Sequence, residues 1–160
     1  MRQQGSRRRW CPNTHLAMNI DSYESLTRRI GCMRLKRCGS EPTLTVFVAY
    51  APTSDYNDEE VEAFYVELEK FYKEDHTFYK VIVGDFNAKI GPRRSPEELH
   101  IGTHGLEWKE QGERLSEFIM STKTIHGNSQ FQKPPSLRWN PPVANSTTRS
   151  TTSSSIESIV

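Results

Sequence analysis

The sequence lacks any apolar run that approaches the roughly 20 residues needed to span a bilayer. Arginines near the amino terminus are not followed by an apolar segment, which argues against a secretory signal. Cysteine is scarce as well. Cys11, Cys32 and Cys38 include no Cys-x-x-Cys pair, which argues against a paired-cysteine zinc framework and an even set of disulfides. We therefore expect an intracellular protein, the nucleus included, with reduced thiols and no membrane segment.

The sequence also lacks an overall excess of charge. Its 21 lysine and arginine residues nearly balance 20 aspartate and glutamate residues, so total charge gives no indication of nucleic-acid binding. The charge is uneven, however, because residues 1–40 are basic and residues 55–69 are acidic. A basic arm can contact phosphate groups, but a solvated, disordered leader over residues 1–12 is the interpretation we favour.

Regular patterns occupy the middle of the chain. Residues 43–51 (TLTVFVAYA) and 81–83 (VIV) are rich in β-branched and aromatic side chains and predict buried strands. Between them, residues 57–72 carry apolar side chains at three- and four-residue spacing, which predicts an amphipathic helix capped by Asn57. A second helix is predicted over residues 112–120. Strand, helix, strand, helix is an order typical of a layered α/β fold.

The composition changes abruptly at Asn140. Residues 140–160 are rich in serine and threonine, so we expect a disordered tail behind a domain that spans residues 13–139. One hypothesis is that a frameshift or faulty splice near Trp139 produced this tail, because codons can be chosen so that another reading frame encodes an alternating segment with Ile-Asp-His. The coding DNA tests that hypothesis directly.

The stretch VIVGDFNAKIG, residues 81–91, carries the chemistry. Alternation along a strand sends Asp85 and Asn87 to the same side at its carboxyl end. A carboxylate there can activate water or hold a divalent cation, and an amide can donate to a phosphate oxygen. Gly84 leaves room for close approach. The alternative is a strand that ends in an ordinary Asx turn, since both residue types are common in turns.

The segment VIVGDFNA resembles the Gly-Asp-Phe-Asn signature of the endonuclease/exonuclease/phosphatase superfamily, and AYAPTS, residues 49–54, is similar to its Tyr-x-Pro strand end. The endonuclease domains of LINE-type non-LTR retrotransposons are the members it resembles most. The resemblance implies a partial four-layer α/β sandwich that uses Mg²⁺, or Mn²⁺, to cleave DNA. It implies that Asp85 readies the attacking water and contacts the metal indirectly, and that Asn87 and Tyr50 hold the phosphate. A half-buried structural tyrosine is the alternative for Tyr50.

This sequence also departs from the family's pattern. The family's metal-binding glutamate cannot be placed, and its carboxyl-terminal Asp-His pair is absent. We therefore expect a domain truncated at both ends with impaired activity, since catalytic groups that act as a unit fail together. The alternatives are a non-catalytic remnant that binds nucleic acid weakly and a phosphatase of the same superfamily. A partial sandwich would leave one face of the central strands exposed, namely Val46, Val48, Val81 and Val83.

Overall fold

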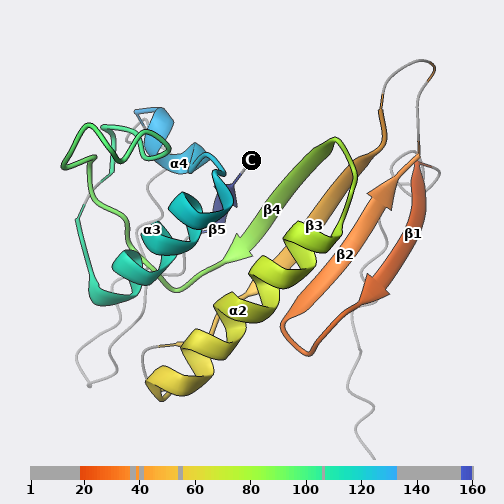
Figure 1. Cartoon of the computed structure of the whole chain (residues 1–160), viewed down its shortest axis with the longest axis horizontal. Helices are drawn as coiled ribbons and strands as arrows, with labels where there is room; N and C mark the ends of the chain where they lie inside the picture. The colour runs from red at the N-terminus through yellow and green to blue at the C-terminus, as the bar shows by residue number, and fades with distance from the viewer. Residues whose placement is uncertain are drawn as a thin grey trace, which may run out of the picture.

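The structure, a computed structural model, describes residues 19–36, 39, 42–53, 56–105, 107–132 and 156–159. In chain order it contains β1 (Ile20–Ser25), β2 (Ile30–Leu35), β3 (Leu44–Tyr50), α2 (Asp58–Glu74), β4 (Tyr79–Asp85), α3 (Glu110–Thr122), α4 (Gly127–Gln130) and β5 (Ile156–Ile159). Figure 1 shows α2 lying across one face of the sheet, with α3 beside it. The fold is α/β and incomplete as a sandwich, as predicted.

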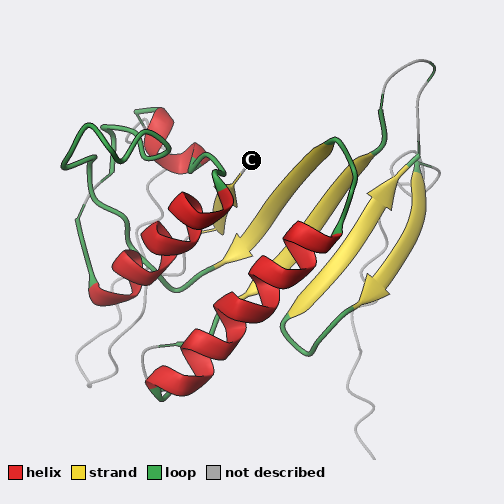
Figure 2. Cartoon of the chain, in the orientation of Figure 1, coloured by secondary structure: helices red, strands yellow, loops and turns green. Residues whose placement is uncertain are grey.

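The sheet has the order β1-β2-β3-β4-β5. The β1–β2 and β2–β3 pairs are antiparallel, whereas β3 and β4 are parallel and run in register from Leu44 opposite Tyr79 to Tyr50 opposite Asp85. Parallel neighbours require a crossover, and α2 supplies it (Figure 2). The two buried strands predicted from the sequence are therefore confirmed as β3 and β4.

The helix predicted over residues 57–72 is confirmed as α2, with its expected cap. The Glu60 backbone N–H donates to Oδ1 of Asn57 at 2.9 Å, and three acidic residues occupy the first turn. Acidic side chains favour a helix amino terminus because the unpaired N–H groups there carry partial positive charge. The apolar face of α2 buries Val61, Phe64, Tyr65 and Leu68.

The core lies between α2, α3 and one face of the sheet. Along β3 the side chains alternate, so that Thr45, Phe47 and Ala49 are buried while Val48 and Tyr50 are exposed. Helix α3, predicted over residues 112–120, completes the core from the side, and the Phe118 ring lies 5.8 Å from the Tyr65 ring between centroids. The remaining buried members include Ile82, Phe86, Leu115 and Ile119.

The opposite face of the sheet is open in the described part of the chain. Val48 is 44% exposed there, and Val46, Val81 and Val83 are half-buried. Of the four valines that were predicted to be exposed, only Val48 is exposed, and the other three are half-buried.

Strand β5 departs from the predicted disordered tail. Residues Ile156–Ile159 pair antiparallel with β4, from Ile82 opposite Ile159 to Asp85 opposite Ile156. The physical reason is that the last residues of the tail are not as polar as the rest: two isoleucines favour an extended conformation, and β4 otherwise presents a free edge. The rest of the tail (residues 140–155 and 160), the end of the predicted domain (residues 133–139) and the leader (residues 1–12) lie outside the described residues.

The long segment between β4 and α3 is packed, although its sequence is polar. Ile90 and Ile101 are buried, and the Arg94 guanidinium lies 3.8 Å from the centre of the Trp108 ring while it pairs with Glu98 and Glu113. Among the described residues, no helix has the length and apolar character needed to cross a membrane.

Candidate functional site

Two strand ends bring Tyr50 and Asp85 together at the carboxyl edge of the parallel pair. The residues are register partners, and the Ala51 N–H donates to the Asp85 carbonyl at 2.8 Å, which extends the pairing one residue beyond β3. Tyr50 is 52% exposed and lies on the open face of the sheet, because its neighbour Ala49 faces the core. Asp85 has the same orientation by register. Two residues singled out from the sequence are therefore neighbours across the strands.

Asn87 is positioned by a turn and not by strand alternation. Strand β4 ends at Asp85, and Asn87 has φ 48°, a left-handed conformation that asparagine tolerates better than most residues. Its N–H donates to Oδ1 of Asp85 at 3.0 Å, which is the Asx turn considered as the alternative. The expectation that alternation places Asn87 is wrong, because the pleat ends two residues before it.

The Asn87 side chain joins the two strand ends. Its Nδ2 donates to the Ala51 carbonyl at 2.9 Å. The same short segment thus receives a backbone bond from Asp85 and a side-chain bond from Asn87, which fixes the spacing between the ends of β3 and β4. The predicted phosphate contact of Asn87 stays a prediction.

Gly84 is needed for packing within the sheet. A Cβ atom at this position would lie 1.9 Å from the Ala49 carbonyl oxygen, far inside van der Waals contact. The close approach expected at Gly84 is therefore that of the β3 backbone, not of a ligand.

Arg29 is a member of the site that the sequence analysis missed. It lies in the turn between β1 and β2, and its guanidinium carbon is 4.8 Å from the Tyr56 ring centre and 5.9 Å from the Tyr50 ring centre. Within the described ranges, Arg29 forms no ion pair with a carboxylate. We call Arg29, Tyr50, Tyr56, Asp85 and Asn87 the carboxyl-edge site. The sequence shows Arg28-Arg29 only as part of a basic segment, because the sheet order that puts this turn beside Tyr50 is not written in a local pattern.

A second polar group lies at the other end of the parallel pair. Asp75, at the end of α2, accepts from the Arg34 guanidinium at 3.0 Å and from the Thr77 N–H at 2.8 Å. Burial raises the pKa of the Asp75 carboxyl, but the hydrogen bonds from Thr77 and Arg34 outweigh it, so the pKa is lowered. Lys80 Nζ donates to the Tyr72 and Asp75 carbonyls. We call Arg34, Thr45, Asp75, Thr77 and Lys80 the amino-edge cluster.

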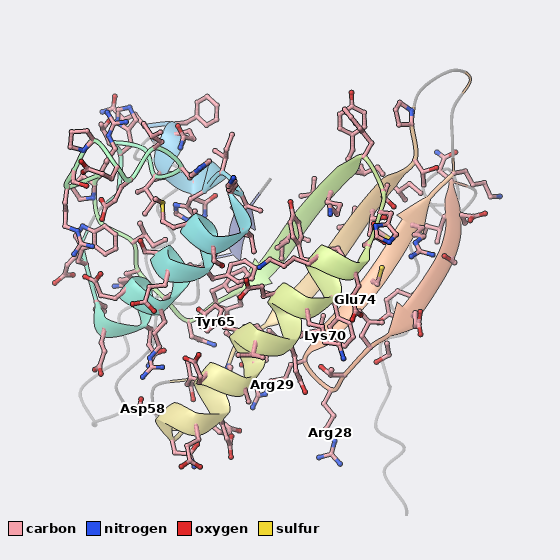
Figure 3. All side chains as sticks on the ribbon, viewed as in Figure 1. Arg28, Arg29, Asp58, Tyr65, Lys70 and Glu74 are labelled. Atoms are coloured by element: carbon pink, nitrogen blue, oxygen red, sulfur yellow. The ribbon has the colours of Figure 1, made fainter. Side chains whose placement is uncertain are left out.

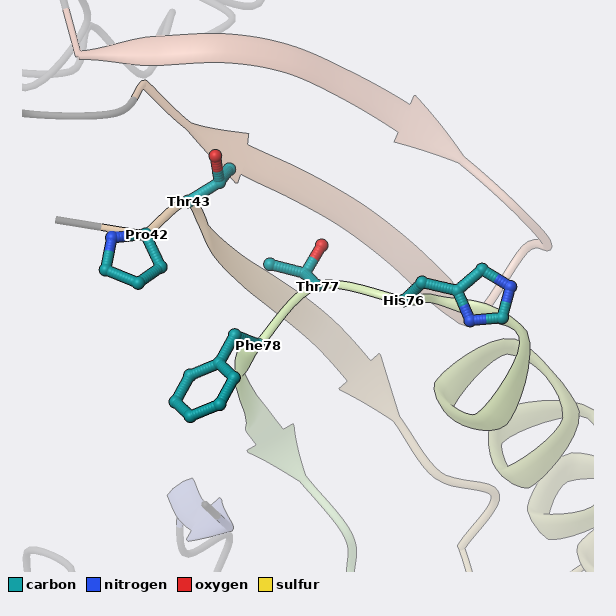
Figure 4. A pocket seen from close by; sticks show the side chains of 5 residues that line it. All are labelled: Pro42, Thr43, His76, Thr77 and Phe78. Carbon is teal, nitrogen blue, oxygen red and sulfur yellow. The ribbon is translucent and has the colours of Figure 1, made fainter. Parts of the chain in front are cut away.

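A shallow hollow of about 370 Å³ adjoins the amino-edge cluster, lined by Pro42, Thr43, His76, Thr77 and Phe78. Figure 4 shows that these side chains do not converge, because His76 is turned away from Pro42 and Phe78. The Thr77 hydroxyl already accepts from the Thr45 hydroxyl at 2.9 Å. This end of the sheet therefore has a hollow without a converging set of polar groups.

Metal ligands are sparse in the described residues. No group of three or more histidine, cysteine, aspartate or glutamate side chains gathers there as a metal site. Cys32 is free and buried, and its burial raises the pKa of the thiol. His100 and His104 belong to the packed segment before α3, as loop residues.

Two curated proteins are similar to this chain. Craniofacial development protein 2 of Bos taurus is 35% identical over 98 residues, which is 60% of this chain and 16% of that protein. Craniofacial development protein 2 of Tragulus javanicus is 33% identical over 114 residues, which is 66% of this chain and 20% of that protein. The chain thus spans about a fifth or less of the length of these relatives. No family model matches the sequence.

These relatives correct the family assignment. The resemblance to LINE-type retrotransposon endonucleases, and to the endonuclease/exonuclease/phosphatase superfamily behind it, is wrong: the similar proteins carry the name of a craniofacial development protein, and no family model supports the superfamily. The error has a physical origin. A buried strand followed by Gly-Asp-Phe-Asn is explained locally by strand packing at Gly84 and an Asx turn at Asp85. A motif that local structure already accounts for carries less family information than its letters suggest.

Proposed function

We propose that the carboxyl-edge site binds a phosphate ester and hydrolyses it. The observation that carries this proposal is that the Arg29 guanidinium, the rings of Tyr50 and Tyr56 that hold it, and the Asp85 carboxylate come together at one sheet edge. A guanidinium recognises phosphate through two parallel hydrogen bonds, and a carboxylate can accept a proton from water. Asp85 is the residue to which we assign the hydrolysis.

The chemistry assigned to the site is a single displacement. Asp85 accepts a proton from a water molecule, the water oxygen forms a bond to phosphorus, and the ester oxygen leaves with its bonding electrons and takes up a proton from solvent. Tyr50, 52% exposed beside Asp85, is placed to donate its hydroxyl to a phosphate oxygen.

Mg²⁺ is part of this proposal only as a partner of the substrate. This cation is commonly held by one or two carboxylates, with waters and substrate phosphates as the other ligands. Asp85 would contact the cation indirectly, through a water molecule, and the cation would neutralise charge on the phosphate. The residues of the carboxyl-edge site address the phosphate ester group itself, and DNA as a partner came only from the corrected resemblance.

The test compares Asp85→Asn with the unchanged protein on bis(p-nitrophenyl) phosphate and p-nitrophenyl phosphate, with Mg²⁺ or with a chelator. We expect Asp85→Asn to lower nitrophenol release by about 100-fold, the effect typical of losing a general base. Glu67→Gln removes an exposed carboxylate on α2 and is the matched control. Equal release by the unchanged protein and Asp85→Asn would contradict the proposal.

Binding without turnover is the second candidate. It is favoured by the internal partners of the site, because Asp85 Oδ1 accepts from the Asn87 N–H and Asn87 Nδ2 donates to Ala51. An oxygen lone pair that accepts this internal hydrogen bond is not available to a water molecule at the same time. In this case phosphate esters bind to the protein, but no nitrophenol is released above the Asp85→Asn background.

A further inference from the structure

We propose that Arg29 is the phosphate-binding residue of the carboxyl-edge site and that the pocket beside it receives a flat ring carried by the same phosphate ester. This inference rests on the proposed function for the identity of the phosphate group. It adds the class of ester, a phosphate joined to an aromatic alcohol or a nucleoside, and a second subsite.

The backbone of Arg29 is held firmly in the β1–β2 turn. The Thr27 hydroxyl accepts from the Arg29 and Ile30 N–H groups, each at 3.1 Å, and the Arg29 carbonyl accepts from the Tyr50 N–H at 2.9 Å. These hydrogen bonds fix the backbone position from which the Arg29 side chain extends. A preorganised cation loses less conformational entropy when it binds an anion than a mobile one does.

The aromatic rings hold the guanidinium without neutralising it. Tyr56, 45% exposed, and Tyr50, 52% exposed, present their faces to Arg29 at 4.8 Å and 5.9 Å. Among the described residues, no hydrogen bond or ion pair of the Arg29 guanidinium accompanies these ring contacts. Arg29 is therefore oriented and still able to form the paired hydrogen bonds that a phosphate accepts.

A pocket of about 180 Å³ adjoins Arg29, over the open face of the sheet. It is lined by Tyr23, Ser25, Thr27, Arg28, Arg29, Ile30, Gly31 and Val48. Its volume is below the range of about 300–1,000 Å³ that holds drug-sized ligands, so it suits one ring system and not a larger molecule.

The lining of this pocket matches a flat ring. Val48, 44% exposed, gives an apolar floor, and Tyr23, 67% exposed, gives an aromatic wall. Gly31 leaves the floor without a side chain, and the Tyr23 hydroxyl lies 3.0 Å from the place where a Cβ would be. Ring stacking on an exposed tyrosine tolerates many ring types.

Two positive charges at the edge of the pocket suit the phosphate group of the ligand. Arg28 and Arg29 both line it, and Figure 3 shows that Arg28 extends outward from the turn. A ligand with its ring on Tyr23 and Val48 would place its phosphate at Arg29, between the pocket and the Tyr50–Asp85 pair. A phosphate ester that carries a ring can therefore occupy the pocket and the phosphate position at Arg29 together. An anion without a ring can occupy only the phosphate position.

The experiment measures dissociation constants by titration calorimetry for inorganic phosphate, phenyl phosphate and adenosine 5′-monophosphate on the full chain. Both ring-bearing esters are expected to bind tighter than inorganic phosphate, by about tenfold for one stacked ring. Whichever ester binds tighter identifies the ring as simple aromatic or nucleobase. Equal affinity for all three, or binding of none, would overturn the proposal.

Variants separate the two subsites. Arg29→Gln should weaken all three ligands by about tenfold, whereas Lys70→Gln, the same charge change on an exposed position of α2 (Figure 3), should weaken none. Tyr23→Ala and Gly31→Ala should weaken only the ring-bearing esters. Unchanged binding by Arg29→Gln, or equal loss in Lys70→Gln, would contradict the assignment. Should Arg29→Gln fail to fold, Arg29→Lys replaces it, since lysine keeps the charge but cannot form the paired contact, and a smaller loss is then expected.

The outcomes also separate this inference from the proposed function. Ring preference and Arg29 dependence without any hydrolysis would leave the binding site standing and remove only the role of Asp85. Hydrolysis that depends on Asp85 but shows no ring preference would remove the pocket and leave the proposed reaction.

Discussion

The two ends of the β3–β4 pair carry polar groups that differ in what satisfies them. In the amino-edge cluster, Asp75 is buried and its oxygens accept from Thr77 and Arg34, while Lys80 is bound to two carbonyls. In the carboxyl-edge site, Arg29 rests on two exposed tyrosine rings. Polar groups that bond to one another stabilise the fold. Arg29 has only ring contacts for its guanidinium among the described residues, so its N–H groups can still bond to a ligand.

The largest expected effect on stability comes from disrupting the pairing of β3 with β4, on which both ends depend. Gly84→Ala would place a methyl group 1.9 Å from the Ala49 carbonyl oxygen, so β3 and β4 would have to separate. We expect a loss of about 3 kcal/mol in the free energy of unfolding, at the upper end for an overpacked position. Urea denaturation followed by circular dichroism measures it. Gly31→Ala, in strand β2, is the matched control, because its Cβ would meet only the end of the exposed Tyr23 side chain. Equal losses in both variants would contradict the steric explanation.

The next largest effect on stability is expected from a substitution in the amino-edge cluster. Asp75→Asn keeps the shape of the side chain but removes the charge that the Arg34 and Thr77 donors face, so we expect a loss of about 2 kcal/mol. This loss is smaller than the loss expected for a fully buried ion pair, because the Arg34 side chain is 51% exposed and its charge is screened by water. Asp85→Asn at the other end should change stability much less. A larger loss at Asp85 than at Asp75 would reverse the comparison between the two ends.

Acid titration tests the same carboxylate. The pKa of Asp75 is lowered in the folded protein, so its contribution to stability is complete above the ordinary aspartate pKa of about 4. As pH falls below that value, the folded protein resists taking up the proton and the contribution is lost on passing through the lowered pKa. The stability difference between the unchanged protein and Asp75→Asn should therefore shrink toward zero with acid. A difference that stays constant from pH 7 to pH 2 would show that another cause produces it.

The strands and helices of the core were predictable because their causes are local. The alternation of Thr45, Phe47 and Ala49 and the three- and four-residue spacing in α2 both follow from burial on one face. The carboxyl-edge site was only half predictable. Tyr50 and Asp85 stand at strand ends in the sequence, but Arg29 comes beside them only through the β2–β3 pairing, where the Tyr50 N–H reaches the Arg29 carbonyl. Such pairing is set by the whole sheet and has no local signal.

The smallest expected effect is the difference of about 1 kcal/mol between two variants of Asn87, which separates two roles of this residue. Asn87 has a left-handed backbone, φ 48°, and a side-chain hydrogen bond to the Ala51 carbonyl. Substitution by glycine or by alanine changes these two features differently. Asn87→Gly tolerates the left-handed backbone and removes the side-chain hydrogen bond. The free energy of unfolding should therefore fall by the contribution of that bond alone, about 1 kcal/mol. Asn87→Ala removes the same bond and adds the strain of a Cβ in the left-handed region, another 1 kcal/mol or so. If the two variants have the same free energy of unfolding, the left-handed backbone is not strained and asparagine stands there for its side chain alone. If glycine is neutral, the bond to Ala51 does not stabilise the strand ends, and Asn87 is then available to contact a phosphate instead.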